Sequence, residues 1–461
     1  MKIKPVLDSE FKPSVLYNRE FLREASLPVS IAIQRENGLT HRVDTKLTTS
    51  PAKNRFYLER LVKTLLWSVG GYRVMLSPGG AGDHVQGDID IVDIYRDAFD
   101  HIRLCYAPDG LRSFDSAFMS RIYENPFSVE SLSPNEMPAA RANPVSIGRH
   151  LDGRRIGFDA GGSDMKVSAV VDGRVVFSQE IVWHPKVNHD PEYHYAHIKE
   201  AIDIAREKLG QVDAIGVSSA GVYVDNRAMA ASLFIKIPPD KFNARIKDIY
   251  KNIAGDIPLV VCNDGDVAAL AGSMHKNSNA VLGIAMGTSE AAGYVDKNGR
   301  ITGWLNELAF VPVDFQPEAP VDEWSGDIGC GVKYFSQDAV IRLAPRAGIS
   351  LDSGLTPAEK LKVVQTHLAD GHAGAIQIFE TIGVWFGYAL ASYAELYEIE
   401  LIQILGRVTS GKAGDIILDK ATQVLKAEFP EYADRMTLYI PDEYERRVGQ
   451  SIAAASLPEF K

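Results

Sequence analysis

The sequence predicts an α/β protein in which one arrangement of strands and helices occurs twice behind an N-terminal extension. A glycine turn between two apolar strands occurs in "RIGFDAGGSDMKVSAV", residues 155–170. The same order of strand, glycine turn and strand returns in "AVLGIAMGTSEAAGYV", residues 280–295. Alternating helices and strands follow each copy, which is typical of a duplicated domain. We therefore expect an N-terminal α/β extension over 1–150 and two related domains over 151–275 and 276–461, with a cleft between those two.

Composition narrows the class of protein. The 461 residues are 46% hydrophobic and 24% charged, as in ordinary globular proteins with two to four domains. No apolar run is long enough to cross a bilayer, and the first twenty residues lack the apolar core of a signal peptide, so we expect a cytoplasmic protein without a membrane partner. The net charge of −11 argues against nucleic acid as a partner. Three widely spaced cysteines (Cys105, Cys262 and Cys330) suggest neither a disulfide framework nor a CxxC metal site.

The N-terminal region follows a pattern of its own. Asn37-Gly38 stands between two alternating apolar stretches and predicts a hairpin. We further expect a helix over 55–69, a strand over 72–76, a glycine-rich turn over 77–84, an amphipathic run over 89–101 and a linker or arm over 124–150. The sequence leaves three roles open for this unit: covering the cleft, binding a partner, or extending an oligomer interface.

In the two repeats, three strands come first and alternating elements follow. The first repeat predicts strands over 155–159, 166–171 and 174–183, and the second predicts a third strand after the Asn298-Gly299 turn. The apolar run "IQIFETIGVWFGYALASYAELY", residues 376–397, predicts a central buried helix in preference to a dimer face. A homodimer is still expected.

The two glycine turns are candidate phosphate sites. Small residues leave several backbone N–H groups unobstructed, and such converging dipoles with a hydroxyl suit an anion. An acid at the end of the first strand could hold Mg²⁺ through water. A single such turn is more often only a tight turn, but the pair within a duplicated pattern favours two cradles on one nucleotide. The residues concerned are Asp159, Gly161, Gly162 and Ser163 in the first copy and Gly287, Thr288 and Ser289 in the second.

Four motifs in order resemble the ROK family (repressors, open reading frames and sugar kinases) of the actin/hexokinase/Hsp70 superfamily. "GFDAGGSDMKVSAVVDG" and "GIAMGTSEAAGYV" resemble the two phosphate motifs, "LVVCNDGDVAALAG" the segment with the catalytic aspartate, and "ILGRVTSGKAGDIIL" the adenosine motif. The resemblance covers about two thirds of the chain, from Arg154 onward. It implies two actin-like (ribonuclease H-like) ATPase domains that clasp ATP, Mg²⁺ and a sugar in a central cleft.

The resemblance also assigns roles to residues. Asp264, just after an apolar strand, would be the general base that takes the proton of a sugar hydroxyl, and Asn263 and Glu307 would bind the sugar. Asn-Asp-Gly at 263–265 is also a good helix cap, and both roles can hold together. Ser219 and Gly221 lie where the sugar cleft would form, and Gly406 and Gly411 flank the turn that would face adenosine; all four also suit ordinary loops.

Two departures from the family pattern concern the sugar pocket and zinc. Ala309 stands where the family has a histidine, and Val332 stands where a sugar-contacting glutamate is usual. Of the family's zinc motif only Gly329 and Cys330 remain, and one thiolate cannot build a tetrahedral site, so we predict no zinc. Other residues must complete the pocket, or the sugar is an unusual one.

Smaller signals leave choices open. His194 and His197 would share a helix face, so a metal pair is conceivable, although residues at the start of a helix are the more common reading. Lys166 either approaches phosphate or is a solvated strand residue.

Three functions compete. The leading hypothesis is an ATP-dependent sugar kinase with a non-standard pocket. The second is a sugar-responsive transcriptional regulator, which would need three short helices and a basic recognition helix near the N-terminus. The third is a catalytically silent sugar-binding protein. Retention of Asp264 and of both turns favours the kinase.

Overall fold

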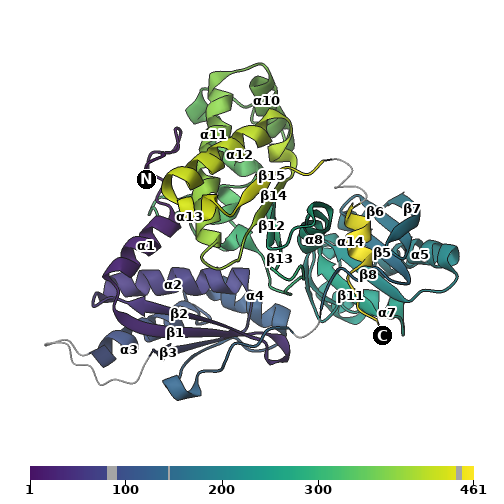
Figure 1. Ribbon diagram of the computed structural model, residues 1–461, viewed down its shortest axis with the longest axis horizontal. Coiled ribbons are helices and arrows are strands. Elements are labelled where there is room, and N and C mark those ends of the chain that lie inside the picture. The colour runs from purple at the N-terminus through teal and green to yellow at the C-terminus, as the bar shows by residue number, and fades with distance from the viewer. Residues whose placement is uncertain (80–90, 144–145, 443–448, 461) are drawn as a thin grey trace.

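The computed structural model describes residues 1–79, 91–143, 146–442 and 449–460 and shows three units (Figure 1). Two of them, here called the first and second lobes, each contain a mixed sheet, and the third is the N-terminal domain. The α/β fold with two related lobes is confirmed. The glycine-rich turn expected over 77–84 lies mostly outside the described residues.

The first lobe has a five-stranded sheet of order β11-β8-β5-β6-β7. The three strands that come first in the chain, β5, β6 and β7, form an antiparallel meander. Strands β8 and β11 then add in parallel beside β5, as the repeat pattern predicts. The strands are β5 (Arg154–Ala160), β6 (Asp164–Val171), β7 (Arg174–Val182), β8 (Ala214–Ser219) and β11 (Leu259–Asn263). The helices are α5 (Pro191–Leu209), α6 (Pro239–Lys241) and α7 (Ile249–Ala254), and β9 (Val222–Val224) pairs with β10 (Arg227–Ala230) in a separate ribbon. Helix α8 (Asp264–Lys276) follows β11 but packs mainly on the sheet of the second lobe.

The second lobe repeats this order with one strand fewer. Its sheet runs β13-β12-β14-β15, formed by β13 (Glu290–Val295), β12 (Val281–Met286), β14 (Leu401–Leu405) and β15 (Thr437–Tyr439). The third strand expected after Asn298-Gly299 is reduced to a single bridge between Val295 and Ile301. The reason is that the chain leaves the sheet there: the Ile301 N–H donates to the Ile147 carbonyl, and the following residues pair with the N-terminal domain.

Helices cover the second lobe, and the most apolar of them is buried. They are α9 (Gln337–Leu343), α10 (Pro357–Ala369), α11 (Ala373–Tyr393), α12 (Lys412–Glu428) and α13 (Pro430–Ala433). Helix α11 packs along α12 and against α1 (Ser14–Glu24), and almost all of its side chains are buried. The prediction of a central buried helix is thus confirmed. In the described part of the chain, none of the helices combines the length and apolarity needed to span a bilayer.

The short helix α14 (Gln450–Ala455) returns to the first lobe. It packs on β5, β8 and α8, and Figure 1 shows it beside the first sheet. The approach requires glycine in two strands, because a Cβ on Gly157 would lie 2.2 Å from the Ser451 carbonyl oxygen and one on Gly216 1.7 Å from that of Ala454. Residues 450–455, expected in the domain over 276–461, therefore lie against the other lobe.

The N-terminal domain is a four-stranded sheet with helices. The strands β1 (Leu27–Gln34) and β2 (Thr40–Leu47) form the predicted hairpin, and β3 (Arg73–Pro78) and β4 (Ser128–Ser131) complete the order β2-β1-β3-β4. Its longer helices are α1, α2 (Pro51–Ser68), α3 (Ile91–Cys105) and α4 (Ser113–Tyr123). The sequence predicted α2, β3 and the run now seen as α3, but missed α1 and α4, and it read the segment with β4 as a linker.

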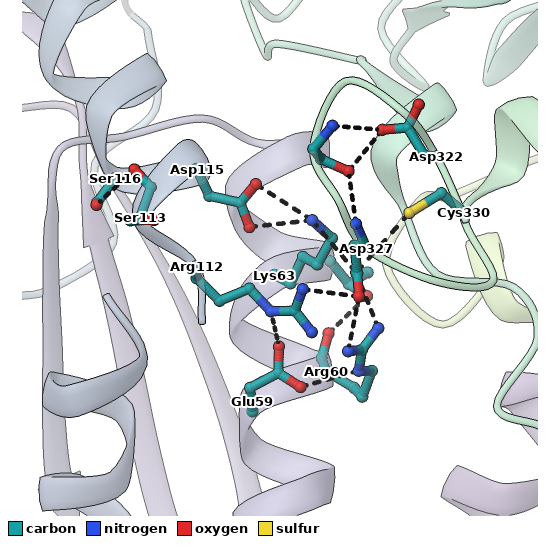
Figure 2. A network of polar contacts seen from close by, with 12 residues as sticks. Glu59, Arg60, Lys63, Arg112, Ser113, Asp115, Ser116, Asp322, Asp327 and Cys330 are labelled. Atoms are coloured by element: carbon teal, nitrogen blue, oxygen red, sulfur yellow. Dashed lines mark hydrogen bonds and ion pairs between the residues drawn. The ribbon is translucent and has the colours of Figure 1, made fainter. Parts of the chain in front are cut away.

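A buried carboxylate joins this domain to the second lobe (Figure 2). Asp327 of the second lobe receives three cations from the N-terminal domain: Arg60 Nη1 at 3.0 Å, Arg112 Nη1 at 2.7 Å and Lys63 Nζ at 3.4 Å. All four side chains are at most 8% exposed. Buried charges are tolerated only when they are paired in this way, so the contact fixes α2 against the second lobe.

Acids of the N-terminal domain balance the extra positive charge. Glu59 pairs with Arg60 and Arg112, and Asp115 Oδ2 lies 3.0 Å from Lys63 Nζ. Burial acts to lower the pKa of Lys63, but Asp115 and the other anions outweigh it and raise the pKa above its usual value. The Cys330 thiol donates to Asp327 at 3.8 Å, so the cysteine left from the zinc motif belongs to this ion network.

The N-terminal domain also contacts the first lobe. Glu124, at the end of α4, pairs with Arg227 and Lys247, and Asn37 Nδ2 donates to Asp225 Oδ1 at 3.2 Å. These groups are more exposed than the network around Asp327. The domain therefore contacts both lobes, and the firmer of the two attachments is to the second lobe.

Lys63→Met is expected to lower the free energy of unfolding by about 3–5 kcal/mol, because Asp115 and Asp327 would stay buried without their lysine. Lys53→Met on the same helix is the matched control. Its pair with Glu24 is about half exposed, so we expect no measurable loss. Urea unfolding followed by circular dichroism measures both. Equal losses in the two variants would contradict the role given to the buried network.

Candidate active site

Polar side chains gather at the carboxyl ends of β5, β8 and β11, where open α/β sheets bind ligands. The register places Asp159 beside Ser218 and Ser219 beside Asn263. Ser218 Oγ donates to Asp159 Oδ1 at 2.6 Å. Ser218, which the sequence placed only beside the expected sugar cleft, thus orients the predicted metal-binding carboxylate.

Asp264 opens α8 directly after β11. The preceding Asn263 caps the helix, since its Oδ1 accepts from the Gly265 N–H at 2.8 Å while its Nδ2 donates to the Gly221 carbonyl at 2.8 Å. The Asp264 carboxylate accepts from the Gly265 N–H at 3.0 Å and from its own N–H. The capping interpretation is therefore correct, and the cap holds Asp264 at the sheet edge.

The predicted carboxylates lie close enough to perturb one another. Burial raises the pKa of Asp159 to about 6 against the bond from Ser218, and the charge of Asp264 adds to the rise. Burial likewise raises the pKa of Glu307 to about 7, with Asp264 and Asp266 contributing. The pKa of Asp264 is also raised by burial. Clustered acids with raised pKa values are typical of active sites, and here they come from both lobes.

The segment that carries Glu307 is fixed by the N-terminal domain. The N–H groups of Leu305, Asn306 and Glu307 donate to the carbonyls of residues 69, 68 and 67 at 3.2, 2.9 and 2.9 Å. These carbonyls lie at the C-terminal end of α2, where a helix leaves carbonyl groups without partners of its own. The extension whose role the sequence left open therefore positions a predicted sugar-binding residue.

A second support for this segment comes from α8. Asp266 Oδ1 accepts from the Tyr294 N–H at 3.0 Å and from Asn306 Nδ2 at 2.9 Å, and Tyr397 donates to Asn306 Oδ1 at 3.0 Å. Burial raises the pKa of Asp266 to about 7. The catalytic candidate and the Glu307 segment are thus linked through one buried carboxyl.

Both glycine turns present exposed residues at their tips. In the first, the Gly161 N–H donates to the Asp164 carbonyl at 3.0 Å, and Gly162 and Ser163 are exposed. In the second, the Gly287 N–H donates to the Ser289 carbonyl at 2.9 Å, and Thr288 and Ser289 are exposed. The tips have the open backbone that phosphate binding requires.

The remaining predicted residues differ in accessibility. Ser219 is fully buried, and its hydroxyl is hydrogen-bonded to Tyr223 and Tyr250 at 2.6 and 3.0 Å, so it offers no surface to a substrate. Gly406 has φ 103°, and a Cβ there would lie 2.3 Å from the carbonyl oxygen of Met286, the residue before the second glycine turn. Gly411 is exposed in front of α12. The predicted adenosine turn therefore lies beside the second phosphate turn.

The ring nitrogens of the two candidate metal-binding histidines lie against backbone carbonyl groups. The His194 ring nitrogens lie 3.0 and 3.1 Å from the Asp190 and Pro185 carbonyls, and His197 Nδ1 lies 2.7 Å from the Tyr193 carbonyl. Within the described ranges, His, Cys, Asp and Glu side chains do not form a group of three or more that could hold a metal ion. The interpretation as residues at the start of a helix thus fits the structure better than a metal pair, although His194 is fully buried and not partly exposed as that interpretation expected.

Glu290 was not singled out from the sequence. It follows the second turn on β13, is 3% exposed, and neither carboxyl oxygen has a hydrogen-bond partner among the described residues. A Cβ on Gly331 would lie 2.3 Å from Oε2, so glycine makes room for this carboxyl. Burial raises its pKa well above the usual value, and the nearby Glu307 adds to the rise. The sequence did hold a signal for Glu290: it is an acidic residue at a strand position that faces inward.

Glu290→Gln is expected to stabilise the protein by about 1–3 kcal/mol at pH 8, because it replaces an ionisable buried group without partners. A carboxyl whose pKa is raised by folding stabilises the fold at low pH and loses that contribution as pH rises. The melting temperature of the variant minus that of the wild type should therefore increase between about pH 5 and 9. Glu400→Gln, at an exposed position, should show no such trend. A constant difference for Glu290→Gln would contradict this assignment.

Comparisons with known proteins fit this arrangement. No family model matches the chain, and no curated protein matches it. Among solved structures, a ROK hexokinase from Thermus thermophilus shares 18% identity over 65% of this chain and 97% of its own, with a TM-score of 0.50. A ROK-family transcriptional regulator, a homolog of the E. coli MLC protein, shares 18% identity over 67% of this chain and 78% of its own, with a TM-score of 0.51. A ROK glucokinase from Streptomyces griseus, solved with glucose and AMPPNP, shares 22% identity over 66% of this chain and 99% of its own, with a TM-score of 0.48. The part of the chain that follows the N-terminal domain thus has the fold of the ROK sugar kinases and regulators.

Proposed function

We propose that the protein is a ROK-family kinase that transfers the γ-phosphoryl group of ATP to a sugar hydroxyl, with Asp264 as general base. The observation that carries the proposal is the position of Asp264. Its carboxylate stands at the sheet edge, bonded only to backbone N–H groups among the described residues, and the charges of Asp159 and Glu307 lie nearby. A base within reach of a hydroxyl and a phosphate cradle is what phosphoryl transfer needs from a protein.

In this mechanism Glu307 orients the sugar, and Asn263, whose amide oxygen and nitrogen both bond the backbone, positions the base instead of binding the sugar as expected. Glu307 accepts from two sugar hydroxyls, while Asn263 keeps Asp264 in place through the helix cap. Asp264 takes the proton of the attacking hydroxyl as its oxygen bonds to the γ-phosphorus, and the bond from that phosphorus to the bridging oxygen breaks to release ADP. The two glycine turns bind the phosphates through backbone N–H groups.

Asp159 suits the expected magnesium ion. One of its oxygens accepts from Ser218, and the other has no hydrogen bond among the described residues and can accept from a metal-bound water. When bound, Mg²⁺ would neutralise phosphate charge. Its charge would also favour the ionised form of Asp159, whose pKa burial raises.

The structure of the N-terminal domain favours a kinase over a regulator. A regulator of this fold was expected to carry three short helices with a basic recognition helix. Residues 1–79 and 91–143 instead contain a four-stranded sheet. Helix α2 of this domain is held against the second lobe by Asp327 and by the segment that carries Glu307. A helix held in this way is not free to enter a DNA groove. The cytoplasm and a homodimer remain our expectations for its location and assembly.

Asp264→Asn is expected to lower kcat by about 10²–10⁴-fold, because the amide cannot accept the hydroxyl proton. The measurement is ADP release with Mg-ATP across a panel of hexoses, amino sugars and sugar alcohols. The control is Asp256→Asn, at an exposed aspartate just before β11, the strand that leads to Asp264. This variant should keep full activity. Turnover retained in Asp264→Asn would exclude this residue as the base. Sugar binding by the wild type without any turnover would instead indicate a sugar sensor.

The kcat/KM of the wild type is expected to fall as the pH is lowered through 7 and 6, because Glu307 and Asp159, with pKa values of about 7 and 6, must be ionised to act. The loss should approach tenfold per pH unit between about pH 7 and 6 and steepen toward a hundredfold per unit below about pH 6, where both groups are protonated. Initial rates between about pH 5 and 8.5 test this, with circular dichroism to show that the fold persists. A flat profile over that range would contradict the assigned roles.

A further inference from the structure

The segment after β7 lies against the first glycine turn. The Trp183 N–H donates to the Ser163 carbonyl at 3.1 Å, and the indole Nε1 donates to the Gly161 carbonyl at 2.8 Å. Trp183 is 1% exposed, so these bonds are shielded from water. The segment over 183–188 and the glycine turn therefore form one rigid unit.

Helix α5 holds the other side of this segment. His194 is fully buried and lies 3.1 Å from the Pro185 carbonyl, and the Tyr193 hydroxyl accepts from the His184 N–H at 2.9 Å. Asn188 Nδ2 donates to the His184 carbonyl at 2.8 Å. The histidine-rich stretch, for which a metal site was considered, thus holds the 183–188 segment in place from the side opposite the glycine turn.

Lys186, the central residue of the short 3₁₀ turn Pro185–Val187, extends over the first glycine turn. A Cβ on Gly162 would lie 3.0 Å from both Lys186 Cε and Lys186 Nζ. The positive charge of Lys186 acts to lower the pKa of Asp264, so the ammonium group also lies near the candidate base. One lysine therefore lies between the phosphate turn and the catalytic carboxylate.

This lysine is exposed, and over the described residues its ammonium group has neither an ion pair nor a hydrogen bond. Nearby cations are paired: Lys199 with Asp203, and Arg245 with Glu192. Lys166, the basic residue inside the first turn's strands, lies opposite Asp159 in the β5–β6 register and acts to lower its pKa. Among the described residues, Lys186 thus brings an unpaired ammonium group to Gly162, where it can meet an anion.

We propose that Lys186 contacts the transferred phosphoryl group and neutralises the negative charge on its oxygens in the transition state. The inference rests on the proposed kinase function and adds a catalytic residue to it. Lys186 stays protonated throughout: the sugar oxygen bonds to phosphorus, the bond to the bridging oxygen breaks, and the sugar proton goes to Asp264. A fixed cation at this position stabilises charge without reorganisation of water.

The test compares Lys186→Met with Lys199→Met, a matched substitution on α5 away from the site, using a sugar that the wild type phosphorylates. We expect Lys186→Met to lower kcat by about 10²–10³-fold with little change in the KM of the sugar. Lys186→Arg should restore part of the rate, since it keeps the charge. Lys199→Met should keep the wild-type rate.

The pH profile supplies a readout that a merely structural role would not move. Loss of the Lys186 charge raises the pKa of Asp264, which must also be ionised to act as base, so the acidic fall of kcat/KM that Glu307 and Asp159 produce should begin at higher pH and be steeper in Lys186→Met. An active wild type with Lys186→Met within twofold of its rate and an unshifted profile would overturn the inference and leave the kinase function intact.

Calorimetry with AMPPNP and with AMP separates the two proposals if no sugar is phosphorylated. Weaker AMPPNP binding in Lys186→Met, with AMP binding unchanged, would keep the phosphate contact although the kinase function had failed. Equal AMPPNP binding by the wild type and Lys186→Met, or no binding by the wild type, would overturn the contact as well.

Discussion

The buried carboxylate of Asp327 is the interaction on which the placement of the site depends. Three cations from the N-terminal domain converge on it in a region that excludes water. Moving such charges out of water is costly, so they stay buried only when every partner is in place. This fixes the position of α2, and the end of α2 in turn holds the backbone that carries Glu307. The geometry around Glu307, the proposed sugar-binding residue, therefore depends on charges well outside the site.

The site itself combines rigid supports with carboxylates that resist ionisation. Ser218 orients Asp159, the Asn263 cap orients Asp264, and Asp266 with Asn306 orients the Glu307 segment. Burial raises the pKa of each acid, and the charge of Asp264 adds to the rise at Asp159 and Glu307. A substrate or cation that supplies compensating positive charge or hydrogen bonds is therefore bound with a favourable electrostatic contribution.

The sequence predicted the duplicated α/β fold because glycine turns and strand periodicity are local signals. It also placed Asp159, Asp264 and Glu307 among the site residues, and the structure brings these three close together. It could not reveal Lys186 or Glu290, because their importance comes from neighbours distant in the chain, Gly162 and Gly331. The ion network was hidden for the same reason: Lys63 and Asp327 look like ordinary surface residues until the domains pack. The prediction of a third strand in the second repeat was wrong, because backbone pairing of this segment with the end of α2 overrode its local preference for a strand.

The return of α14 to the first sheet has a consequence for the order of folding. The strands β5 and β8 leave the ribosome early, yet the helix that covers Gly157 and Gly216 is translated only after the whole second lobe. Until then, one face of the first sheet lacks its apolar cover and is open to wrong contacts. Contacts between such distant segments also slow folding, since a long loop must close before they form. The first lobe is thus begun early in translation and completed late.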